Sequence, residues 1–486
     1  MQLTADVCQR ALRARDPRFD GIFYVGITTT GVYCRPVCPS RMAYPTRRRF
    51  FDSAAAAEQA GFRPCLRCRP ELAPGRALMD AVPQLAGVAA LRIAAGALNG
   101  HSVAHLAREL GVSARHVRRA LERELGVSPV ALAQTHRLLL AKRLLADTDL
   151  PVTRIAYASG FQSLRRFNSA FRERYRLSPS ALRPRPRAAR PENDLVRLTL
   201  AYRAPLAWDA LTELLGRSAL PGVEAIEAGR YGRTVRLDGR VGVVFAADAA
   251  VAASHGAAKA HLNLDVSPSL LPVLMPLLAR LRQLFDLDAE PTVIDAHLAE
   301  GGLGASVRRR GGVRVPGALD GFEAALSALL LGQGRWGAVS RESARRVVWA
   351  LGEGIETGFP ALSRLSPTAE RVAAAGPGRL AALGVPPRRA GALAAVARAV
   401  IAGTLRLAPG SDIVAARRAL LAIDGVGDRC TTTIVMRALT WPDAFPASDP
   451  LLRRAAGVSS ARDLYALAER WRPWRAYAAL HLWLNR

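Results

Sequence analysis

Four cysteines in two short-spaced pairs are the residues of this sequence best suited to bind a metal ion. Cys34 and Cys38 form the first pair, and Cys65 and Cys68 form the second after a further 26 residues. Each pair can place two sulfur atoms on one tetrahedral ion, and four thiolates make a closed zinc site. The pattern predicts one Zn²⁺ ion. The ion either only stabilises the fold of a small domain, which is the commoner role of zinc, or also activates one thiolate as a nucleophile.

A zinc-bound sulfur stays deprotonated and nucleophilic near neutral pH. The segments TTTGVYCRPVC (28–38) and AGFRPCLRC (60–68) resemble the N-terminal zinc domain of the adaptive-response (Ada-type) proteins. The resemblance implies that one zinc-bound thiolate takes a methyl group irreversibly from a methyl phosphotriester in DNA, and the matching acceptor is Cys34. Methylation would make Cys34 a neutral thioether, so repulsion between the cluster and DNA would fall and DNA binding would tighten.

A second candidate for chemistry is Asp449, which follows a two-glycine hairpin formed by Gly425 and Gly427. Backbone amides of such a hairpin can hold a DNA phosphate at the N-terminus of the next helix. A carboxylate near a sugar can stabilise oxocarbenium character, or orient an attacking water molecule, as a glycosidic bond breaks. The alternative for a lone Asp is a helix cap, because Asp449 precedes an expected helix.

The hairpin (423–430), the segment ERWRPWRAY (469–477) and the run LLLGQ (329–333) together resemble the helix-hairpin-helix DNA glycosylases. The resemblance is strongest to the alkylbase (AlkA-type) branch and covers residues 195–486. It implies that an alkylated purine such as 3-methyladenine is flipped out of the duplex and released by hydrolysis of its N-glycosidic bond. It also implies that the run LLLGQ begins the segment that probes the DNA.

The resemblance assigns roles to single residues of this half. Asp449 occupies the position of the catalytic carboxylate, and Gly425 and Gly427 occupy the DNA-binding hairpin. Trp483 matches an aromatic of the base pocket, where the electron-poor ring of an alkylated base is attracted to an aromatic face. Trp471 and Trp474 are instead expected to pack in the core.

The lysine content distinguishes two subtypes of glycosylase. Enzymes that also cut the strand use a lysine just after the hairpin to form a Schiff base, and here Arg429 stands at that place. Residues 260–486 contain no lysine, and a protonated arginine cannot attack a sugar carbon. The sequence therefore predicts a monofunctional glycosylase. It departs from the AlkA-type branch at Arg429 and Thr433, where aromatics are usual, and it has no Pro-Cys-His-Arg motif for direct reversal of O6-methylguanine.

Two matched helix-turn-helix patterns lie between these regions. In both, an apolar stripe at helical spacing leads to a glycine turn and a serine cap, Ser113 or Ser163. The second helix of such a unit enters the major groove, so its early arginines are candidate DNA contacts. They are Arg115, Arg118, Arg119, Arg165 and Arg166. The alternative is that these arginines only form a solvent-exposed basic face and do not contact DNA. The presence of two matched helix-turn-helix patterns argues against this alternative. Residues 100–183 resemble the DNA-binding domain of the AraC-type transcription factors, which implies an activator of repair genes.

The charge of the chain indicates a polyanionic partner. Among 486 residues, 68 Lys+Arg face 40 Asp+Glu, and the net charge of +28 excludes an acidic globular enzyme. Residues 1–190 hold 32 of these cations against 13 acids, so most of the excess lies early in the chain. Double-stranded DNA, as alkylated sites and as a promoter, is the expected partner. An anionic membrane is the alternative to nucleic acid, and RNA polymerase is a further expected partner of an activator.

The sequence indicates a cytoplasmic protein. It shows neither a basic start followed by an apolar core nor an apolar run of the roughly 20 residues that a membrane helix needs. In that compartment cysteines are more often metal ligands or thiols than disulfides. Cys8 and Cys430 have no partner at metal-binding spacing and are expected to be lone packed thiols. A monomer is expected.

The expected architecture is multidomain. A small α+β zinc domain (1–75) precedes an all-α double helix-turn-helix domain (85–183), a Pro/Arg linker (184–193), an α+β sheet domain (194–305) and an all-α helix-hairpin-helix glycosylase domain (308–486). The secondary structure expected is a linking helix at 129–146, strands near 196–202, 232–237 and 241–245, and only helices after residue 318.

Two other functions remain possible on the sequence alone. The protein can be a methylation-responsive transcriptional activator whose glycosylase half is only a DNA-binding platform. Alternatively, it can be a glycosylase whose N-terminal half only delivers it to DNA. Release of a methylated base and transfer of a methyl group to Cys34 are the two reactions that separate these possibilities.

Overall fold

The computed structural model describes residues 3–74, 84–183, 195–252, 260–332 and 337–485. Contacts divide the chain into two units, Met1–Tyr202 with Asn263–Ala279 and Arg203–Leu262 with Arg280–Arg486. The predicted linker at 184–193 and Gln333 of the predicted DNA-probing segment lie outside the described residues. In the part of the chain that is described, no helix is long and apolar enough to cross a membrane.

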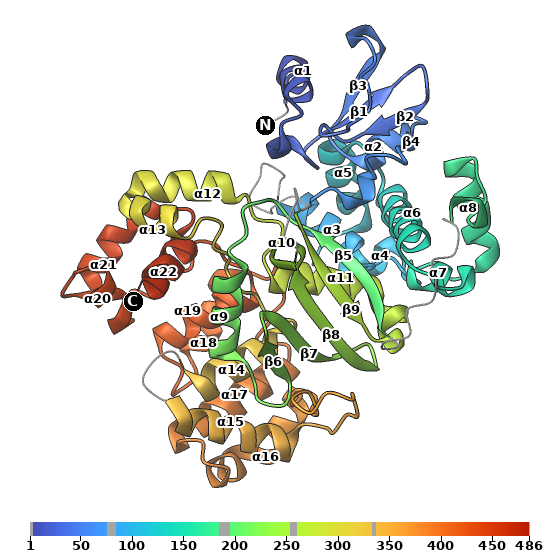
Figure 1. Ribbon diagram of the computed structural model, residues 1–486. Helices are drawn as coiled ribbons and strands as arrows, with labels where there is room; N and C mark the ends of the chain where they lie inside the picture. The colour runs from blue at the N-terminus through green and yellow to red at the C-terminus, as the bar shows by residue number, and fades with distance from the viewer. Residues whose placement is uncertain (1–2, 75–83, 184–194, 253–259, 333–336, 486) are drawn as a thin grey trace. The chain divides into compact units, whose positions relative to one another are not determined.

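The zinc-binding region is built on a four-stranded sheet in the order β3-β1-β2-β4 (Figure 1, blue). Strand β1 pairs antiparallel with β2 and β3, with Val25 opposite Cys34, and β4 pairs with β2 in parallel. Helix α2 contacts β1, β3 and β4. The elements are α1 Ala5–Ala14, β1 Tyr24–Ile27, β2 Val32–Cys34, β3 Arg48–Phe51, α2 Ala54–Gln59 and β4 Arg63–Pro64.

The following helices contain the two predicted helix-turn-helix units, α4 with α5 and α7 with α8. The elements are α3 Gln84–Ala94, α4 Val103–Glu109, α5 Ala114–Leu125, α6 Pro129–Asp147, α7 Val152–Ala158 and α8 Leu164–Tyr175. The hydroxyls of Ser113 and Ser163 accept hydrogen bonds from the N–H groups of His116 and Arg166, so both predicted caps are confirmed. The predicted linking helix is α6.

The turn before α8 requires glycine. Gly160 has φ of +86°, and a Cβ atom there would lie 2.3 Å from the Asn99 side chain. Only a residue without a side chain adopts this conformation and leaves that space free. The glycine of the predicted turn is therefore explained by its backbone conformation and by its neighbour.

The sheet domain contains a five-stranded sheet in the order β5-β9-β8-β7-β6 (Figure 1). The elements are β5 Val196–Ala201, α9 Trp208–Ser218, β6 Glu224–Glu227, β7 Arg230–Leu237, β8 Arg240–Asp248, α10 Ala249–Ala252, β9 His261–Val266 and α11 Leu274–Leu284. Strands β6, β7 and β8 pair antiparallel in chain order. The three predicted strands correspond to β5, β7 and β8, whereas β6 and β9 were not predicted.

Helices are the regular elements of the rest of the described chain, as predicted after residue 318, and isolated β-bridges pair Gly222 with Leu362 and Gly354 with Arg364. The helices are α12 Pro291–Leu298, α13 Gly304–Arg309, α14 Gly321–Leu331, α15 Gly337–Leu351, α16 Ala369–Ala382, α17 Pro387–Ile401, α18 Ile413–Leu421, α19 Asp428–Ala438, α20 Pro450–Ala455, α21 Ala461–Ala468 and α22 Arg475–Leu484, with short 3₁₀ or π turns between some of them. Buried apolar side chains of α14, α15, α17 and α19 share one core, which includes Leu326, Val347, Leu393 and Ile434. The fold is the predicted multidomain α+β and all-α assembly.

Candidate functional site

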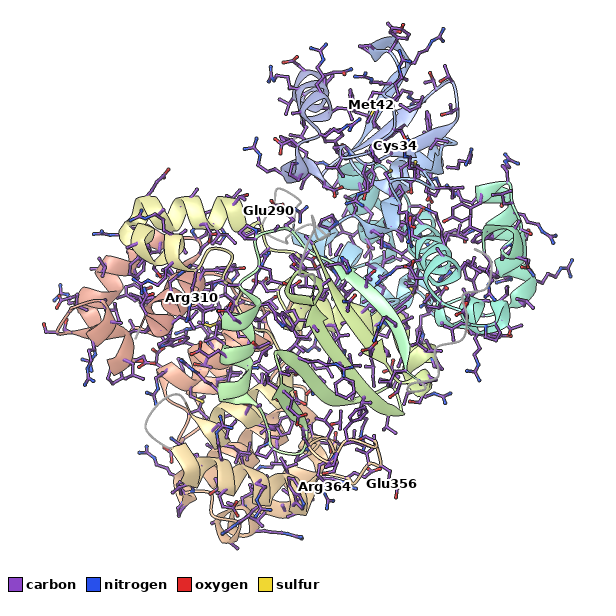
Figure 2. The ribbon with its side chains drawn as sticks, viewed as in Figure 1. Cys34, Met42, Glu290, Arg310, Glu356 and Arg364 are labelled. Atoms are coloured by element: carbon purple, nitrogen blue, oxygen red, sulfur yellow. The ribbon has the colours of Figure 1, made fainter. Side chains whose placement is uncertain are left out.

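The four predicted cysteine ligands form one cluster in the zinc-binding region. Their sulfur atoms lie within 4.8 Å of one another, and all four residues are buried. Strand β2 ends at Cys34 and β4 directly precedes Cys65, so the parallel pairing of these strands brings the two cysteine pairs together. Met42 packs against the cluster, and Figure 2 shows it near Cys34. Four close thiol ligands fit the tetrahedral coordination of zinc, so the cluster is a zinc site.

Hydrogen bonds distinguish the sulfur atoms of the cluster. The backbone N–H of Arg35 donates to Cys68 Sγ at 3.4 Å, and that of Arg67 donates to Cys65 Sγ at 3.3 Å. Among the described residues, no backbone N–H donates to Cys34 Sγ. A hydrogen bond to a thiolate stabilises its negative charge and makes it a weaker nucleophile. The Cys34 sulfur therefore keeps more of its nucleophilicity than the sulfurs of Cys65 and Cys68.

The Arg35 side chain places a cation beside the cluster. Its Nε donates to Asp20 Oδ1 at 2.7 Å, and its Nη1 donates to the Cys68 carbonyl at 3.1 Å. Burial lowers the pKa of Arg35, but the Asp20 carboxylate together with Cys68 and Tyr24 raises it, so the pKa is raised overall. The arginine stays charged and fixes the loop that carries Cys68.

A buried lysine connects the zinc site to the helix-turn-helix region, which the sequence did not predict. Lys142 of α6 is buried, and its Nζ donates to Glu71 Oε2 at 2.6 Å and to the Cys65 carbonyl at 3.2 Å. Arg69 also binds Glu71, at 3.0 Å, and forms two hydrogen bonds with Asp147 at the end of α6. The segment that carries Cys65 is therefore bound to α6 by the hydrogen bonds and ion pairs of Lys142 and Arg69.

Replacing Lys142 with methionine is expected to lower the free energy of unfolding by about 2–4 kcal/mol, because the buried Glu71 carboxylate then loses one of the two cationic partners, Lys142 and Arg69, that it has among the described residues. Chemical denaturation of the zinc-loaded protein measures this. The double variant Lys142→Met/Glu71→Leu should recover most of the loss. A loss no larger than that of Arg172→Met, at an exposed position of α8, would contradict the prediction.

The five arginines predicted to contact DNA all lie on the exposed faces of α5 and α8. Arg115, Arg118 and Arg119 are exposed on α5, and Arg165 and Arg166 are exposed on α8. The opposite faces are fully buried at Val117 and Leu121 in α5 and at Phe167 and Phe171 in α8. Each helix is thus anchored by its apolar face and presents its cations to solvent, as contact with a phosphate backbone requires.

The predicted hairpin joins α18 to α19. Gly425 has φ of +85°, and a Cβ atom there would lie 2.7 Å from the Arg388 carbonyl, so only glycine lets the hairpin approach α17 so closely. Gly427 is the N-cap of α19, and no side chain caps this helix end. The backbone N–H groups of the first turn of α19 therefore have no side-chain acceptor at the cap.

Asp449 is completely buried and is held by two hydrogen bonds. Its Oδ1 accepts from the Leu451 N–H at 2.8 Å as the N-cap of α20, and its Oδ2 accepts from the Trp483 indole N–H at 3.2 Å. The two residues predicted for the catalytic site and the base pocket are thus in direct contact. The helix cap that was the alternative for Asp449 is present, and it occupies only one of the two carboxylate oxygens.

A cavity of about 220 Å³ lies beside the hairpin, next to α9, α14 and α19. Gly425 and Gly427 line it, whereas Asp449 and Trp483 do not. Cys430 also lines it, and burial raises the pKa of this thiol to about 11. The thiol therefore stays protonated near neutral pH and is no nucleophile there.

The other notable side chains of this half have structural roles. Trp471 is buried and its indole N–H donates to the Gly301 carbonyl at 2.9 Å, and Trp474 packs against the His297 ring. Both tryptophans therefore pack within the protein, as predicted. Cys8 is buried and lies outside the zinc cluster. The cavity-lining arginines Arg389 and Arg437 were not predicted, because no motif marks them.

Three family models match the chain. They are the metal binding domain of Ada at residues 7–71, a helix-turn-helix domain at residues 106–185 and the AlkA N-terminal domain at residues 197–320.

Curated relatives match the same regions. The probable bifunctional transcriptional activator/DNA repair enzyme AlkA of Mycobacterium tuberculosis (strain ATCC 25618 / H37Rv) is 39% identical over 98% of this chain and 95% of its own length. The DNA-3-methyladenine glycosylase 2 of Escherichia coli (strain K12) is 33% identical over 59% of this chain and 96% of its own length. The regulatory protein ada of Salmonella typhimurium is 35% identical over 33% of this chain and 43% of its own length.

Proposed function

This chain belongs to the family of bifunctional transcriptional activator and DNA repair enzymes that join an Ada-type half to an AlkA-type half, and we propose that it repairs alkylated DNA by two reactions. One is transfer of a methyl group from a DNA methyl phosphotriester to Cys34. The other is hydrolysis of the N-glycosidic bond of alkylated purines such as 3-methyladenine. The proposed domain boundaries are those expected from the sequence.

The first reaction uses the zinc cluster. Zinc, when bound, keeps the cysteine sulfurs deprotonated near neutral pH. A methyl phosphotriester is neutral, so the negative cluster can approach it more easily than an ordinary phosphate. The Cys34 sulfur attacks the methyl carbon, a C–S bond forms, the C–O bond breaks, and the phosphodiester leaves with the electron pair and its negative charge. The thioether is stable, so each chain reacts once.

The environment of the sulfurs supports Cys34 as the acceptor. Cys65 and Cys68 each accept a backbone N–H, which stabilises their charge. Cys38 is completely buried, whereas Cys34 keeps 7% of its surface exposed. Of the four sulfurs, that of Cys34 combines some access with the absence of a backbone donor among the described residues.

Methylation is also the proposed signal for transcription. It removes one negative charge from a region that must approach DNA, so the affinity of the exposed arginines of α5 and α8 for a promoter should rise. Lys142 supports such a link, because it joins the Cys65 carbonyl directly to α6, which lies between the two helix-turn-helix units. RNA polymerase is the proposed partner of the activated protein.

The second reaction places Asp449 beside the sugar of a flipped nucleotide. The carboxylate stabilises the oxocarbenium character of the breaking bond or orients the attacking water. The Trp483 indole N–H fixes one carboxylate oxygen, and the open N-terminal end of α19 is suited to hold a DNA phosphate. Because Arg429 replaces a lysine after the hairpin, we propose hydrolysis alone, without strand cleavage.

The direct test is to incubate the wild-type protein with duplex DNA that carries labelled methyl groups on bases and on phosphates. Two labelled products are expected: free methylated purine, released with turnover, and methylated protein, formed once per chain. Protein methylation without base release would support an activator whose glycosylase half only binds DNA. Base release without protein methylation would support a glycosylase whose N-terminal half only delivers it.

A further inference from the structure

We propose that Glu58 is a positioning residue for methyl transfer, because it joins the strand that ends at Cys34 to the second helix-turn-helix unit. Contact of α8 with the duplex then positions the phosphotriester at the Cys34 sulfur. The inference rests on the proposed methyl transfer. It goes beyond that reaction by assigning it a residue outside the zinc cluster and by making α8 part of its substrate-binding surface.

Glu58 is a buried acid whose carboxylate has partners on three elements. It belongs to α2 and is 3% exposed. Its Oε1 accepts a hydrogen bond from the Tyr33 hydroxyl of β2 at 3.1 Å. Its Oε2 accepts from the Thr135 hydroxyl of α6 at 2.7 Å and lies 3.3 Å from Arg174 Nη1 of α8. The three contacts form together only in one arrangement of β2, α6 and α8 around α2.

The carboxylate constrains this arrangement more than it stabilises the fold. Burial has the largest effect on the pKa of Glu58 and raises it, whereas Arg174, Thr135 and Tyr33 lower it. The pKa is raised overall, so these partners do not fully offset the cost of burial. Apolar side chains of similar volume often cost less than a buried ion pair, but they do not fix the geometry of a contact. The main effect of Glu58 is therefore on orientation.

Tyr33 connects Glu58 to the methyl acceptor. It directly precedes Cys34 in β2 and is completely buried. Its backbone carbonyl accepts the Cys65 N–H at 2.9 Å, and its ring packs edge-to-face on Tyr24 with the ring centroids 5.7 Å apart. The residue is thus fixed at its backbone, its ring and its hydroxyl. A constraint on the hydroxyl is therefore passed to the backbone of Cys34.

Arg174 connects Glu58 to the DNA-facing end of α8. It is half-buried in the last turn of this helix, whereas Arg165 and Arg166 are exposed in the first turn. The distance from Arg166 to Arg174 is roughly 12 Å along the helix axis. The backbone hydrogen bonds of a helix make so short a length move as one body. Glu58 therefore sets the position of the exposed arginines through the other end of their helix.

The two helices that carry the exposed arginines are joined to the zinc-binding region in different ways. Helix α8 is joined through Glu58, and the Tyr175 hydroxyl fixes it further by donating to the Leu138 carbonyl of α6 at 3.1 Å. Helix α5 instead shares an apolar core with Ala55 of α2. Apolar contact is non-directional, so it holds α5 without setting its orientation as strictly. The arginines of α5 therefore serve as an internal comparison for those of α8.

Methyl transfer depends on precise placement of the phosphotriester. The Cys34 sulfur forms a bond to the methyl carbon while the carbon–oxygen bond breaks, and the phosphodiester oxygen leaves with the electron pair. The methyl carbon must therefore lie close to the sulfur, with the leaving oxygen on its far side. Contacts far from the reacting atoms supply such placement, and a displacement of about 1 Å can slow a reaction about 100-fold. Helix α8 acts in this way only if its position relative to Cys34 is fixed, which is the role of Glu58.

The test measures methyl transfer from a duplex of mixed sequence that carries one labelled methyl phosphotriester. It gives the transfer rate at saturation and the concentration that produces half of this rate. Combined replacement of Arg165 and Arg166 with alanine should lower the saturated rate about tenfold in otherwise wild-type protein. With Glu58→Leu the saturated rate should already be about tenfold lower. The arginine replacements should then change only the half-saturating concentration.

Three further variants separate positioning from folding. Tyr33→Phe removes one hydroxyl and should act like Glu58→Leu in this comparison. Glu173→Leu replaces an exposed acid of α8 and should leave both quantities unchanged. Combined replacement of Arg115 and Arg118 in α5 with alanine should have the same effect with and without Glu58. Zinc content and circular dichroism show whether each variant is folded.

The comparison of backgrounds decides the role of Glu58. Loss of the arginine effect on the saturated rate in Glu58→Leu and in Tyr33→Phe supports the proposal, and Tyr33→Phe alone decides it if Glu58→Leu does not retain zinc. Persistence of that effect in either zinc-loaded background overturns the role of Glu58. A wild-type saturated rate that does not depend on Arg165 and Arg166 overturns the role of α8. Absence of methyl transfer by wild type contradicts the proposed reaction itself.

Discussion

Replacing Cys34 with alanine is expected to abolish methyl transfer from phosphotriester DNA to the protein, while release of methylated bases continues at the wild-type rate. The reason is chemical, since alanine has no sulfur to form the C–S bond, and the remaining sulfurs either accept backbone N–H donors or are fully covered. The measurement is the amount of labelled methyl group bound per chain after the DNA has been removed. Base release from the same sample is the internal reference.

Loss of a ligand can also loosen the zinc-binding region, so controls must separate chemistry from folding. Cys34→His keeps a zinc ligand at this position, so the variant should retain zinc. It has no sulfur at residue 34, so no S-methylcysteine should form there. Cys8→Ala removes a buried thiol outside the cluster and should transfer methyl normally. Full methyl transfer by Cys34→Ala would show that another cysteine is the acceptor.

The same samples test the switch. Wild-type protein that has been methylated should bind duplex DNA more tightly than unmethylated protein, and the difference should shrink as salt is raised, because the change is electrostatic. Cys34→His should show no change in DNA affinity after exposure to phosphotriester DNA. Equal affinities of methylated and unmethylated wild type would remove the charge argument for activation.

Local patterns explain the features that the sequence predicted correctly. The zinc cluster follows from two short cysteine spacings, because ligands two to four residues apart reach one ion whatever the surrounding fold. The serine caps at Ser113 and Ser163 depend on residues within one turn of a helix. Each cysteine pair and each cap is complete within a few residues, so a single sequence suffices to find it, whereas the close approach of Asn99 to Gly160 appears only in the fold.

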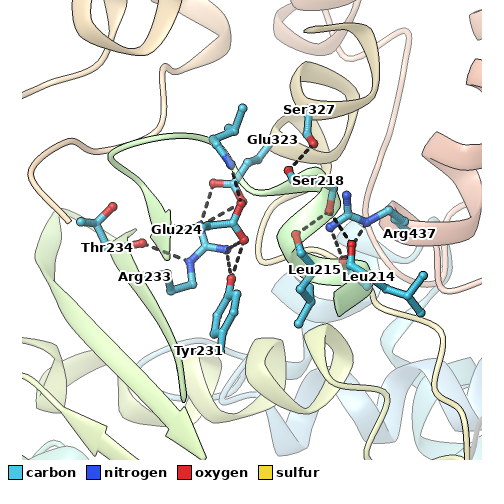
Figure 3. Close-up of polar contacts among 12 residues, drawn as sticks. Leu214, Leu215, Ser218, Glu224, Tyr231, Arg233, Thr234, Glu323, Ser327 and Arg437 are labelled. Carbon is cyan, nitrogen blue, oxygen red and sulfur yellow. Dashed lines mark hydrogen bonds and ion pairs between the residues drawn. The ribbon is translucent and has the colours of Figure 1, made fainter. Parts of the chain in front are cut away.

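Long-range contacts explain what the sequence did not predict. Strand β6 carries the buried Glu224, whose Oε1 accepts a hydrogen bond from the Tyr231 hydroxyl at 2.5 Å and lies 3.6 Å from Arg233 (Figure 3). Both partners belong to the neighbouring strand β7, so the local pattern of β6 does not show why this acid can be buried. Strand β9 alternates buried and half-buried residues and could have been found by this period. Lys142 looks like an ordinary helical cation until Glu71 and the Cys65 carbonyl, about seventy residues earlier in the chain, are seen to surround it.

The glycosylase half contains both a feature that a local motif predicts and a feature that only the fold reveals. The motif predicted the hairpin at Gly425 and Gly427, and the structure has it between α18 and α19. The sequence also marked Arg429 as a departure from the family pattern, but only the fold shows that its guanidinium lines a cavity with Arg389 and Arg437. Which charges are compensated depends on carboxylates from other elements, and no local pattern reports that.

The second large effect is expected at Asp449. Asp449→Asn should lower release of 3-methyladenine about 100-fold or more, a loss typical when an electrostatic contact to the transition state is removed, while affinity for undamaged duplex DNA stays unchanged. Single-turnover release measured with enzyme in excess isolates the chemical step. Methyl transfer to Cys34 should be unaffected, because the zinc cluster belongs to the other unit.

Asparagine is the substitution that separates catalysis from capping at this position. Asparagine caps helices as well as aspartate does, so its amide oxygen can still accept the Leu451 N–H that Asp449 Oδ1 accepts at 2.8 Å. Only the contact of the second oxygen with the Trp483 indole is then lost. If Asp449 were a cap alone, Asp449→Asn would lower the free energy of unfolding by about 1–3 kcal/mol, because the buried Trp483 indole N–H loses its acceptor, and it would leave release by the folded protein unchanged. Asp463→Asn, which replaces an exposed acid of α21, should leave release unchanged. A fall in release for Asp449→Asn alone therefore assigns the carboxylate charge to the reaction, and undiminished release rejects that role.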